Sequence, residues 1–488
     1  MGNRPLSHGQ VSKRTSDLGT VPLGRLLVSL SVPSIIGMVV MSLYNLVDTF
    51  WVGRLPESTV AIAALTVLFP LQMVAGALGA GTGVGVSSLV ARRFGAQRLN
   101  EVSQVAGHAV ALPVLLGLVL TVICVAAPRE LVRLFGATPE ITPSAATYLL
   151  TVAFGFPFLL SMMTLSGLYR GAGNTVTPMV IMLFSAGANA LLDPLLIFGW
   201  QGLPALGIQG AALATVIAQL GAAVLAVIYL CSGRSGYRIN LRDLALRVAI
   251  MRDIAEVGAP AALMHCVGSV VGITFNWVLA GFGAEAIAAQ GLSLRIVMLV
   301  ISFIGGGVHQ GLMPIVAYNF GAQSYRRMWR AYRAAALGTS AIGLGLAAVT
   351  SLIAPQIVGL FTKDPELIRL AVMAYRLRIA TLFLVEPQMM GVASLQGMGK
   401  GLHAMVVTLV RQVGLVIPAL FLLSRSYGVL GAFAAQPVAD TLSLVVTASI
   451  LVSVYRRYPP SASVARVREL DEEDSGAAVV APVASTEL

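Results

Sequence analysis

Apolar stretches of 20 or more residues recur from one end of this 488-residue chain to the other. About 20 consecutive apolar residues suffice for an α-helix to cross the hydrocarbon core of a bilayer. Hydrophobic residues make up 57% of the chain and charged residues only 11%, against about 25% charged residues in a typical soluble domain. The short alternating segments of a transmembrane barrel are not seen. The sequence therefore predicts an all-α polytopic membrane protein.

The breaks between the apolar runs predict about twelve transmembrane helices. They are expected near residues 23–52, 59–90, 102–127, 141–169, 176–198, 206–231, 248–280, 285–317, 329–354, 366–395, 402–423 and 428–455. The first twenty residues are polar and basic and show no short apolar core followed by a cleavage site, so we expect the first helix to act as its own insertion signal.

The net charge of +11 suggests a nucleic-acid partner only until the charges are placed along the chain. With the N-terminus inside, 22 of the 32 Lys and Arg residues fall in inside segments, 8 fall outside and 2 lie within helices. This asymmetry predicts a multi-pass protein of the cell inner (plasma) membrane with both termini in the cytoplasm, and no nucleic-acid partner. The three cysteines are scattered in apolar runs, which fits neither a disulfide framework nor a metal site. We expect no cofactor.

An internal repeat organises the chain. When the second half is laid on the first, residues 79–97 align with 305–323 with 9 identities in 19 positions. We therefore predict two six-helix lobes related by pseudo-two-fold symmetry along the membrane normal, because an even number of helices returns each lobe to the same side. This is an architecture for alternating access with substrate held between the lobes. The predicted parts are an N-terminal cytoplasmic tail, an N-lobe, a cytoplasmic linker, a C-lobe and a disordered cytoplasmic tail, at residues 1–22, 23–232, 233–253, 254–456 and 457–488.

One carboxylate, Asp48, lies within the first predicted helix. An Asp at the centre of a transmembrane helix costs about 2.5–3.5 kcal/mol on insertion scales, so such a residue is a functional candidate. Tyr44 lies one turn before it on the same face. Pro33 leaves the carbonyl of Ser29 without its intrahelical partner, which predicts a kink. The alternative is that Asp48 only hydrogen-bonds a neighbouring helix.

A second polar group lies in the fifth predicted helix. Asn189 and Asp193 are four residues apart and share a face, and Pro194 frees a nearby carbonyl and predicts a second kink. Together with Asp48 and a hydroxyl such as Thr215 in the sixth helix, they make a set of oxygen ligands that can hold a proton or Na⁺. Two neighbouring desolvated carboxyl groups raise each other's pKa, so one of them can titrate near neutrality. Alternatively, Asp193 only caps a helix break at Pro194.

These features resemble the multidrug and toxic compound extrusion (MATE) transporters over roughly residues 25–455. The motifs that carry the resemblance, besides the duplicated six-helix unit, are Val47-Asp48-Thr49 with Gly53, Arg93-Phe94-Gly95-Ala96, Gly171-Ala172-Gly173-Asn174 and Asn189…Asp193-Pro194. The resemblance is closest to the bacterial and archaeal DNA-damage-inducible-like branch. It implies an N-lobe site for the coupling cation, H⁺ or Na⁺, formed by Asp48, Tyr44, Asn189, Asp193 and Thr215.

The resemblance also implies a function. It implies a transporter rather than an enzyme, in the form of an antiporter that exports organic, cationic or amphipathic compounds in exchange for the coupling ion. The expected partners are small-molecule substrates and the lipid bilayer, and we expect a monomer. Two alternatives stay open, namely a lipid-linked-oligosaccharide flippase of the same superfamily and a channel or receptor.

The C-terminal half matches the other well-known branch of the family only in part. Glu386-Pro387-Gln388 resembles its tenth-helix motif, which makes Glu386, Gln388 and Arg295 candidates for substrate binding or coupling. The acid expected in the seventh helix is missing, because residues 258–276 contain none. A structural alternative is that Glu386 pairs with Arg295, and Arg411 with Asp440, as neutralising ion pairs within the membrane.

We predict that Asp48→Asn abolishes gradient-driven efflux while expression stays normal, because the substitution removes the titratable and cation-binding group but keeps the side-chain volume. The measurement is substrate efflux from cells or proteoliposomes, compared at equal protein level. Efflux from Asp48→Asn at the wild-type rate would exclude a cation site at this residue.

Overall fold

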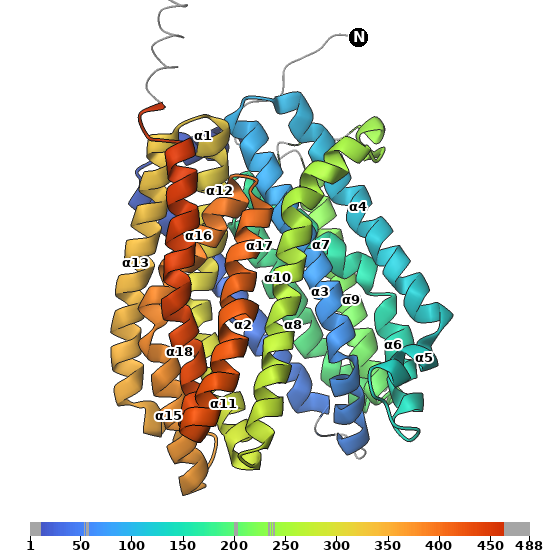
Figure 1. Cartoon of the computed structure of the whole chain (residues 1–488). Helices are drawn as coiled ribbons and strands as arrows, with labels where there is room; N and C mark the ends of the chain where they lie inside the picture. Colours follow the sequence, from blue (N-terminus) through green and yellow to red (C-terminus); the bar gives the residue numbers. More distant parts are fainter. Residues whose placement is uncertain are drawn as a thin grey trace, which may run out of the picture.

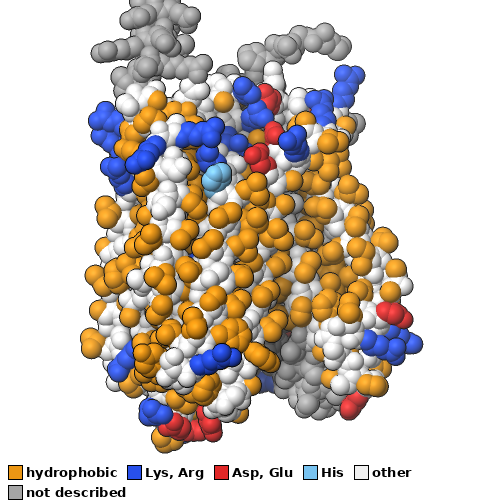
Figure 2. Space-filling model, viewed as in Figure 1, with side chains coloured by type: hydrophobic (Ala, Val, Ile, Leu, Met, Phe, Trp, Pro, Cys, Tyr) orange, Lys and Arg blue, Asp and Glu red, His pale blue; other side chains and the backbone are white. Residues whose placement is uncertain are grey.

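The computed structural model describes the backbone of residues 11–52, 54, 58–199, 204–232, 235, 237 and 240–462. Within these residues every regular element is a helix, as the sequence predicts. The helices stand side by side in one bundle (Figure 1). On the face that Figure 2 shows, hydrophobic side chains cover the middle of the molecule, and many of the Lys and Arg side chains gather at one end.

The first half of the chain forms a series of α-helices within the described residues. They are α1 (Val11–Thr20), α2 (Leu23–Val52), α3 (Ser58–Gly95), α4 (Leu99–Ala126), α5 (Pro128–Leu134), α6 (Thr142–Ala153), α7 (Phe156–Gly171), α8 (Val176–Phe198) and α9 (Ile208–Cys231). The short 3₁₀ turn η2 (Leu241–Leu244) follows in the segment that joins the two halves.

The second half repeats this series with two π-helical turns inserted. Its elements are α10 (Val248–Ala280), α11 (Ala284–Ile301), η3 (Ser302–Gly306), α12 (Gly307–Gly321), α13 (Tyr325–Leu352), α14 (Ala354–Gly359), α15 (Pro365–Ala380), α16 (Leu382–Gly397), α17 (Gly401–Leu409), η4 (Val410–Val416) and α18 (Ile417–Arg457). The π-helical turns are η3 and η4.

By length and apolarity alone, nine helical stretches of the described residues can cross a membrane, or ten if the bent pair α6 and α7 forms one span. The last stretch contains two crossings, because the chain reverses at Gly428 (φ 59°, ψ −140°). Arg411 and Asp440, on either side of this reversal, form an ion pair with 3.6 Å between Nη1 and Oδ1. A continuous helix would separate them by about 43 Å. With α15 and α16, which repeat the bent pair, this agrees with the predicted twelve helices.

The backbone confirms the internal repeat. Gln97 and Gln323, which the repeat places on one another, are the two non-glycine residues of the described chain with positive φ, and both have φ of 58°. Gly173 and Gly399 are also equivalent in the repeat, and both have φ of 78°. A positive φ is uncommon outside glycine, so its recurrence at equivalent positions shows that both halves make the same turns.

The two lobes meet through glycine residues placed symmetrically. Gly95, at the end of α3, lies so close to the carbonyl of Tyr318 in α12 that a Cβ atom would collide with it. Gly321 stands in the same relation to the carbonyl of Arg92. Since Arg92 and Tyr318 are themselves equivalent in the repeat, each lobe presents the same surface to the other, as expected for a two-fold contact.

These contacts lie at the end of the molecule where the basic side chains gather. There the Ser88 hydroxyl donates a hydrogen bond of 2.6 Å to the Gln396 carbonyl in the opposite lobe. Helix α1 lies at the same end (Figure 1), and the Asn319 amide donates to the Leu18 carbonyl at 3.0 Å. In this conformation the lobes are therefore joined at the basic end.

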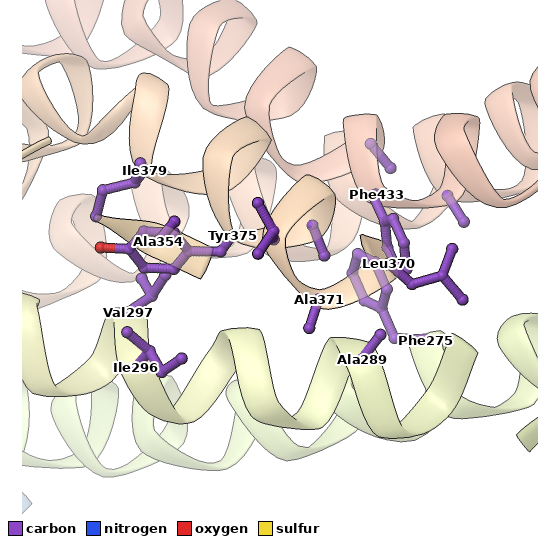
Figure 3. Close-up of a cluster of buried hydrophobic side chains, with 14 of the residues drawn as sticks. Phe275, Ala289, Ile296, Val297, Ala354, Leu370, Ala371, Tyr375, Ile379 and Phe433 are labelled. Atoms are coloured by element: carbon purple, nitrogen blue, oxygen red, sulfur yellow. The ribbon is translucent and has the colours of Figure 1, made fainter. Parts of the chain in front are cut away.

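Each lobe has its own packed interior. In the second lobe, Phe275 of α10, Val297 of α11, Tyr375 of α15 and Phe433 of α18 pack into one buried cluster (Figure 3). Lipid tails are as apolar as these side chains, so helices in a membrane associate through close packing rather than through a hydrophobic driving force. The lobe is consequently a rigid frame for the polar side chains that it encloses.

We predict that Gly95→Ala destabilises the protein by about 1–3 kcal/mol, the usual cost of overpacking, because its methyl group collides with the Tyr318 carbonyl. Thermal unfolding of the purified protein measures the effect. The matched control is Gly338→Ala in α13, where a Cβ would meet no atom within 4 Å and where alanine favours the helix. Equal stability of the two variants would contradict a tight contact at Gly95.

Candidate functional site

The structure brings three of the predicted N-lobe residues together. Asn189 and Asp193 of α8 are fully buried and Thr215 of α9 is 8% exposed. The Asn189 Nδ2 group donates to Asp193 Oδ1 at 3.1 Å and to Thr215 Oγ1 at 3.3 Å. Asn189 and Asp193 meet because they are one helical turn apart, whereas Thr215 is brought in by the packing of α9 against α8.

The side-chain oxygen of Asn189, Oδ1, is buried, and it accepts no hydrogen bond from any described residue. Leaving such an acceptor without a partner costs about 1–3 kcal/mol. Unsatisfied buried groups in native proteins often mark functional positions or ion sites. The Asn189 oxygen is therefore an available ligand next to Asp193.

The remaining N-lobe candidates lie on α2. The backbone of Tyr44 and Asp48 belongs to this helix, but their side chains lie outside the part of the structure that is described. Helices α2 and α8 continue through Pro33 and Pro194 without losing helical structure, and the kinks expected at these residues remain predictions.

In the C-lobe, the Glu386 side chain of α16 is fully buried against the π-helical turn η3. A Cβ added at Gly305 would lie 2.8 Å from each carboxylate oxygen. Neither oxygen has a hydrogen-bond partner within 3.5 Å in the described part of the chain. The Thr339 hydroxyl is a polar neighbour, but it donates to the Ala335 carbonyl at 2.8 Å. Glu386 is therefore a buried acid that the packing leaves largely uncompensated.

The proposed pair between Glu386 and Arg295 is wrong. Arg295 of α11 is exposed, and it forms no ion pair with Glu386 or with any other described residue. The physical reason is the rotation of α11 about its axis, which turns Arg295 toward the surface and away from α16.

The second proposed pair, between Arg411 and Asp440, is present. The Arg411 guanidinium in η4 lies 3.6 Å from the Asp440 carboxylate of α18, and the two side chains are 12% and 5% exposed. The Gln436 amide donates to the same carboxylate oxygen at 3.0 Å. Together they compensate a buried charge that would otherwise be very costly.

Gln388 belongs to this second cluster rather than to the surroundings of Glu386. Its Nε2 group donates to the carbonyls of Leu384 at 3.0 Å and Asp440 at 2.9 Å, and its Oε1 accepts from Ser443 at 2.7 Å. Glu386 and Gln388 are two residues apart, so they point to different sides of α16. Because the side-chain amide of Gln388 already hydrogen-bonds to other protein groups, the geometry favours a packing role for this residue.

The sequence pattern pointed to Gln388, Arg411 and Asp440, but we missed the other polar side chains of this cluster, Gln436, Ser443 and Thr447. The polar residues of α18 that build it share one face, at the helical spacing of Gln436, Asp440, Ser443 and Thr447. A search for polar residues every three or four positions in an apolar run finds this stripe. The two π-helical turns were also missed. Such turns are frequent at functional sites, and here η3 borders Glu386 and η4 carries Arg411.

The fold and these clusters define a polytopic α-helical membrane protein of two repeated lobes with buried polar groups in each. The profile of the MatE family matches residues 33–195 and 260–422, one segment in each half of the repeat. The chain belongs to the MatE family, whose members are transporters. It is thus a multi-span membrane transporter and not an enzyme.

Relatives of known name and structure agree with this assignment. The chain is 27% identical over 435 residues to the multidrug export protein MepA of Staphylococcus aureus (strain NCTC 8325 / PS 47), covering 89% of this chain and 94% of the relative. It is 28% identical over 427 residues to MepA of Staphylococcus haemolyticus (strain JCSC1435), covering 88% and 93%.

Solved structures share the fold. A crystal structure of a MATE protein in the bent conformation superimposes with a TM-score of 0.86 and 28% identity, covering 92% of this chain and 99% of the other. A multidrug resistance MATE family transporter of the MOP superfamily in the outward-facing conformation gives a TM-score of 0.84 and 29% identity, covering 92% and 98%. The two-lobe architecture predicted from the repeat is therefore confirmed.

We predict that Arg411→Gln destabilises the protein by about 3–5 kcal/mol, because removal of one partner leaves a buried charge uncompensated. In the double variant Arg411→Gln/Asp440→Asn both charges are absent, so we expect most of the stability to return. Unfolding of the single and double variants under identical conditions gives the coupling between the two residues. Additive losses would show that the pair does not compensate charge.

Proposed function

We propose that the chain is a secondary antiporter that exports organic, cationic or amphipathic compounds in exchange for H⁺ or Na⁺. The observation that carries this proposal is the buried Asn189–Asp193–Thr215 cluster within one lobe of a MatE-family transporter. Its relatives in two Staphylococcus species are described as multidrug export proteins, which supports efflux of organic compounds.

The register of α2 on α8 supports the inclusion of Asp48 in the cation site. Gly37 of α2 packs against Met182 of α8, where a Cβ would lie 3.1 Å from the methionine sulfur. Asp48 and Asp193 each lie about three full turns further along their helices. When two neighbouring helices cross the membrane in the same direction, residues that lie the same whole number of turns beyond a contact point again toward the partner helix. Asp48 and Asp193 are therefore expected on facing surfaces.

The chemistry of this cluster suits a proton or a hard cation. Carboxylate, amide and hydroxyl oxygens are ligands of the kind that hard cations such as Na⁺ prefer. In our proposal Asp48 and Asp193 supply the charge, while Asn189 and Thr215 supply neutral oxygens and Tyr44 a further hydroxyl. The Asn189 amide, which holds both Asp193 and Thr215, positions the group.

The proposed coupling mechanism links the binding of the cation to the release of the substrate. The lobes are joined at their basic end, which we assign to the cytoplasmic side because Lys and Arg gather there; both termini are then cytoplasmic. In this state we propose that a cation from outside binds near Asp48 and Asp193, α2 shifts about Pro33, and the affinity for substrate falls. Exchange requires the ion and the substrate to favour opposite states, because a ligand moves an equilibrium only by its differential affinity.

We assign Glu386 a contributing role in the C-lobe. A buried carboxyl group that lacks a hydrogen-bond partner among the described residues is too costly to be kept for packing alone. Its position against the π-helical turn η3 gives it a backbone segment that can rearrange. Arg295, on the neighbouring α11, remains a candidate for substrate contact.

Separate pH and Na⁺ gradients imposed on proteoliposomes test this function. We expect fluorescent organic-cation efflux that saturates with substrate and stops when one of the two gradients collapses. Asp193→Asn should abolish it, because the substitution removes a charged ligand from the cation site, while Glu386→Gln should reduce it less.

The matched control is Asp364→Asn, which alters an exposed helix cap outside the cluster and should leave coupling intact. Efflux that persists without either gradient would contradict antiport. If Glu386→Gln lost all transport while Asp193→Asn remained active, the coupling site would lie in the C-lobe rather than in the N-lobe.

A further inference from the structure

The internal repeat continues past the last helix of each lobe. In the N-lobe, the ring of Tyr237 packs on Phe94, with centroids 6.2 Å apart. In the C-lobe, Tyr458 packs on Phe320, the repeat equivalent of Phe94, at 5.1 Å. The two tyrosines are equally far along the chain from the positive-φ glycines Gly207 and Gly428 that begin the last helix of each lobe. The chain therefore leaves both lobes along the same path.

In the N-lobe this path leads across one face of α4. The Arg247 backbone N–H donates to His108 Nε2 at 2.8 Å, and its guanidinium donates to Gln104 Oε1 at 3.1 Å. Gly107, one turn from Gln104, touches the backbone of Asp243 in η2. The face formed by Gln104, Gly107 and His108 is thus covered by the inter-lobe linker, which leaves His108 only 1% exposed.

The equivalent face of the C-lobe is uncovered by described residues. The repeat places the three α4 positions on Arg330, Arg333 and Ala334 of α13, and all three are exposed. The chain leaves the lobe beside this face, because Trp329 Nε1 donates to the Tyr458 carbonyl at 3.0 Å. In Figure 1, α13 and the end of α18 lie next to each other, and Figure 2 shows basic side chains gathered there.

This surface carries basic side chains whose charge no described acidic residue neutralises. We define the basic face as Arg330 and Arg333 of α13 together with Arg456 and Arg457 at the end of α18, all of them exposed. None of the four forms an ion pair with another described residue. The cation–π contact of Arg333 with Tyr455, at 6.0 Å, holds the two helix ends together.

The chain that follows Tyr458 carries Arg466 and Arg468 and then a run of the complementary charge. Its run Glu469-Leu470-Asp471-Glu472-Glu473-Asp474 is acidic at every position but one. The segment between Tyr458 and this run spans up to about 36 Å when extended, while Arg330 and Arg333 are only one helical turn apart on α13. The acidic run can therefore reach any part of the basic face.

We propose that residues 469–474 dock onto the basic face as the C-lobe counterpart of the inter-lobe linker on α4. A segment of this composition cannot form a core of its own, but it can fold on a surface of opposite charge. Docking ties the end of α18 to α13 and neutralises the arginines. Because the contact is electrostatic and exposed, it weakens as salt rises. The inference is independent of the transported substrate and of the coupling ion.

Cysteine cross-linking in the full-length protein tests the docking. Ala334→Cys and Ser475→Cys are introduced after replacement of Cys124, Cys231 and Cys266, and a short bismaleimide is added in nanodiscs of phosphatidylcholine. We expect efficient cross-linking that falls about fivefold or more in about 1 M NaCl, where the Debye length is about 3 Å. Arg330→Gln/Arg333→Gln should reduce it similarly, whereas Arg330→Lys/Arg333→Lys, which keeps the charge, should preserve it.

Ser475→Cys paired with Arg98→Cys, at the exposed start of α4 in the N-lobe, is the control and should cross-link weakly. Absence of the Ala334–Ser475 product overturns the proposal, as does a product that is insensitive to both salt and charge. If instead the Arg→Gln variants lose enrichment of phosphatidylglycerol from mixed nanodiscs and no cross-link forms, the basic face binds lipid headgroups and the tail does not dock.

Discussion

The structure depends on a backbone contact that only glycine permits. Gly95 and Gly321 bring the ends of α3 and α12 against the carbonyls of Tyr318 and Arg92 in the opposite lobe. Any side chain at these positions would push the lobes apart. The contact is repeated about the pseudo-two-fold axis, and the lobes also meet along α3 and α10 and along α2 and α12, where Gly85 approaches the Ile254 carbonyl and Gly307 approaches Ile35. In a transporter that works by alternating access, these glycine-lined seams are the surfaces along which the lobes must rock against each other.

The internal repeat accounts for the helices of each lobe but not for the buried polar residues that each lobe encloses. By the alignment of the two halves, Asn189 and Asp193 correspond to Leu415 and Ala419, while Glu386 corresponds to Leu160. Each lobe therefore encloses polar groups where the other is apolar. Neither carboxylate is needed to build the six-helix unit, since the other lobe folds without it. The carboxylates are additions to the frame, which is the reason to assign them functional roles.

The two clusters differ in how their charge is compensated. In the C-lobe, Asp440 has a guanidinium and an amide as partners and belongs to a dense hydrogen-bond network, which stiffens the packing of α18 against η4. In the N-lobe, the Asn189 side-chain NH₂ group organises the cluster, and its side-chain oxygen accepts no hydrogen bond from a described residue. A network in which every group has a partner tends to fix one structure, while a network with spare ligands can accept an ion.

The sequence by itself determined the helices, the repeat and the shared face of Asn189 and Asp193, because hydrophobic length and helical spacing are local properties. It also showed that Glu386 and Asp440 would need partners in the membrane. Only the tertiary structure decided that Asp440 has an ion-pair partner and that Glu386 has neither an ion-pair nor a hydrogen-bond partner among the described residues. The rotation of each helix about its own axis, which no local pattern specifies, leaves Arg295 exposed, pairs Arg411 with Asp440 and turns Gln388 away from Glu386.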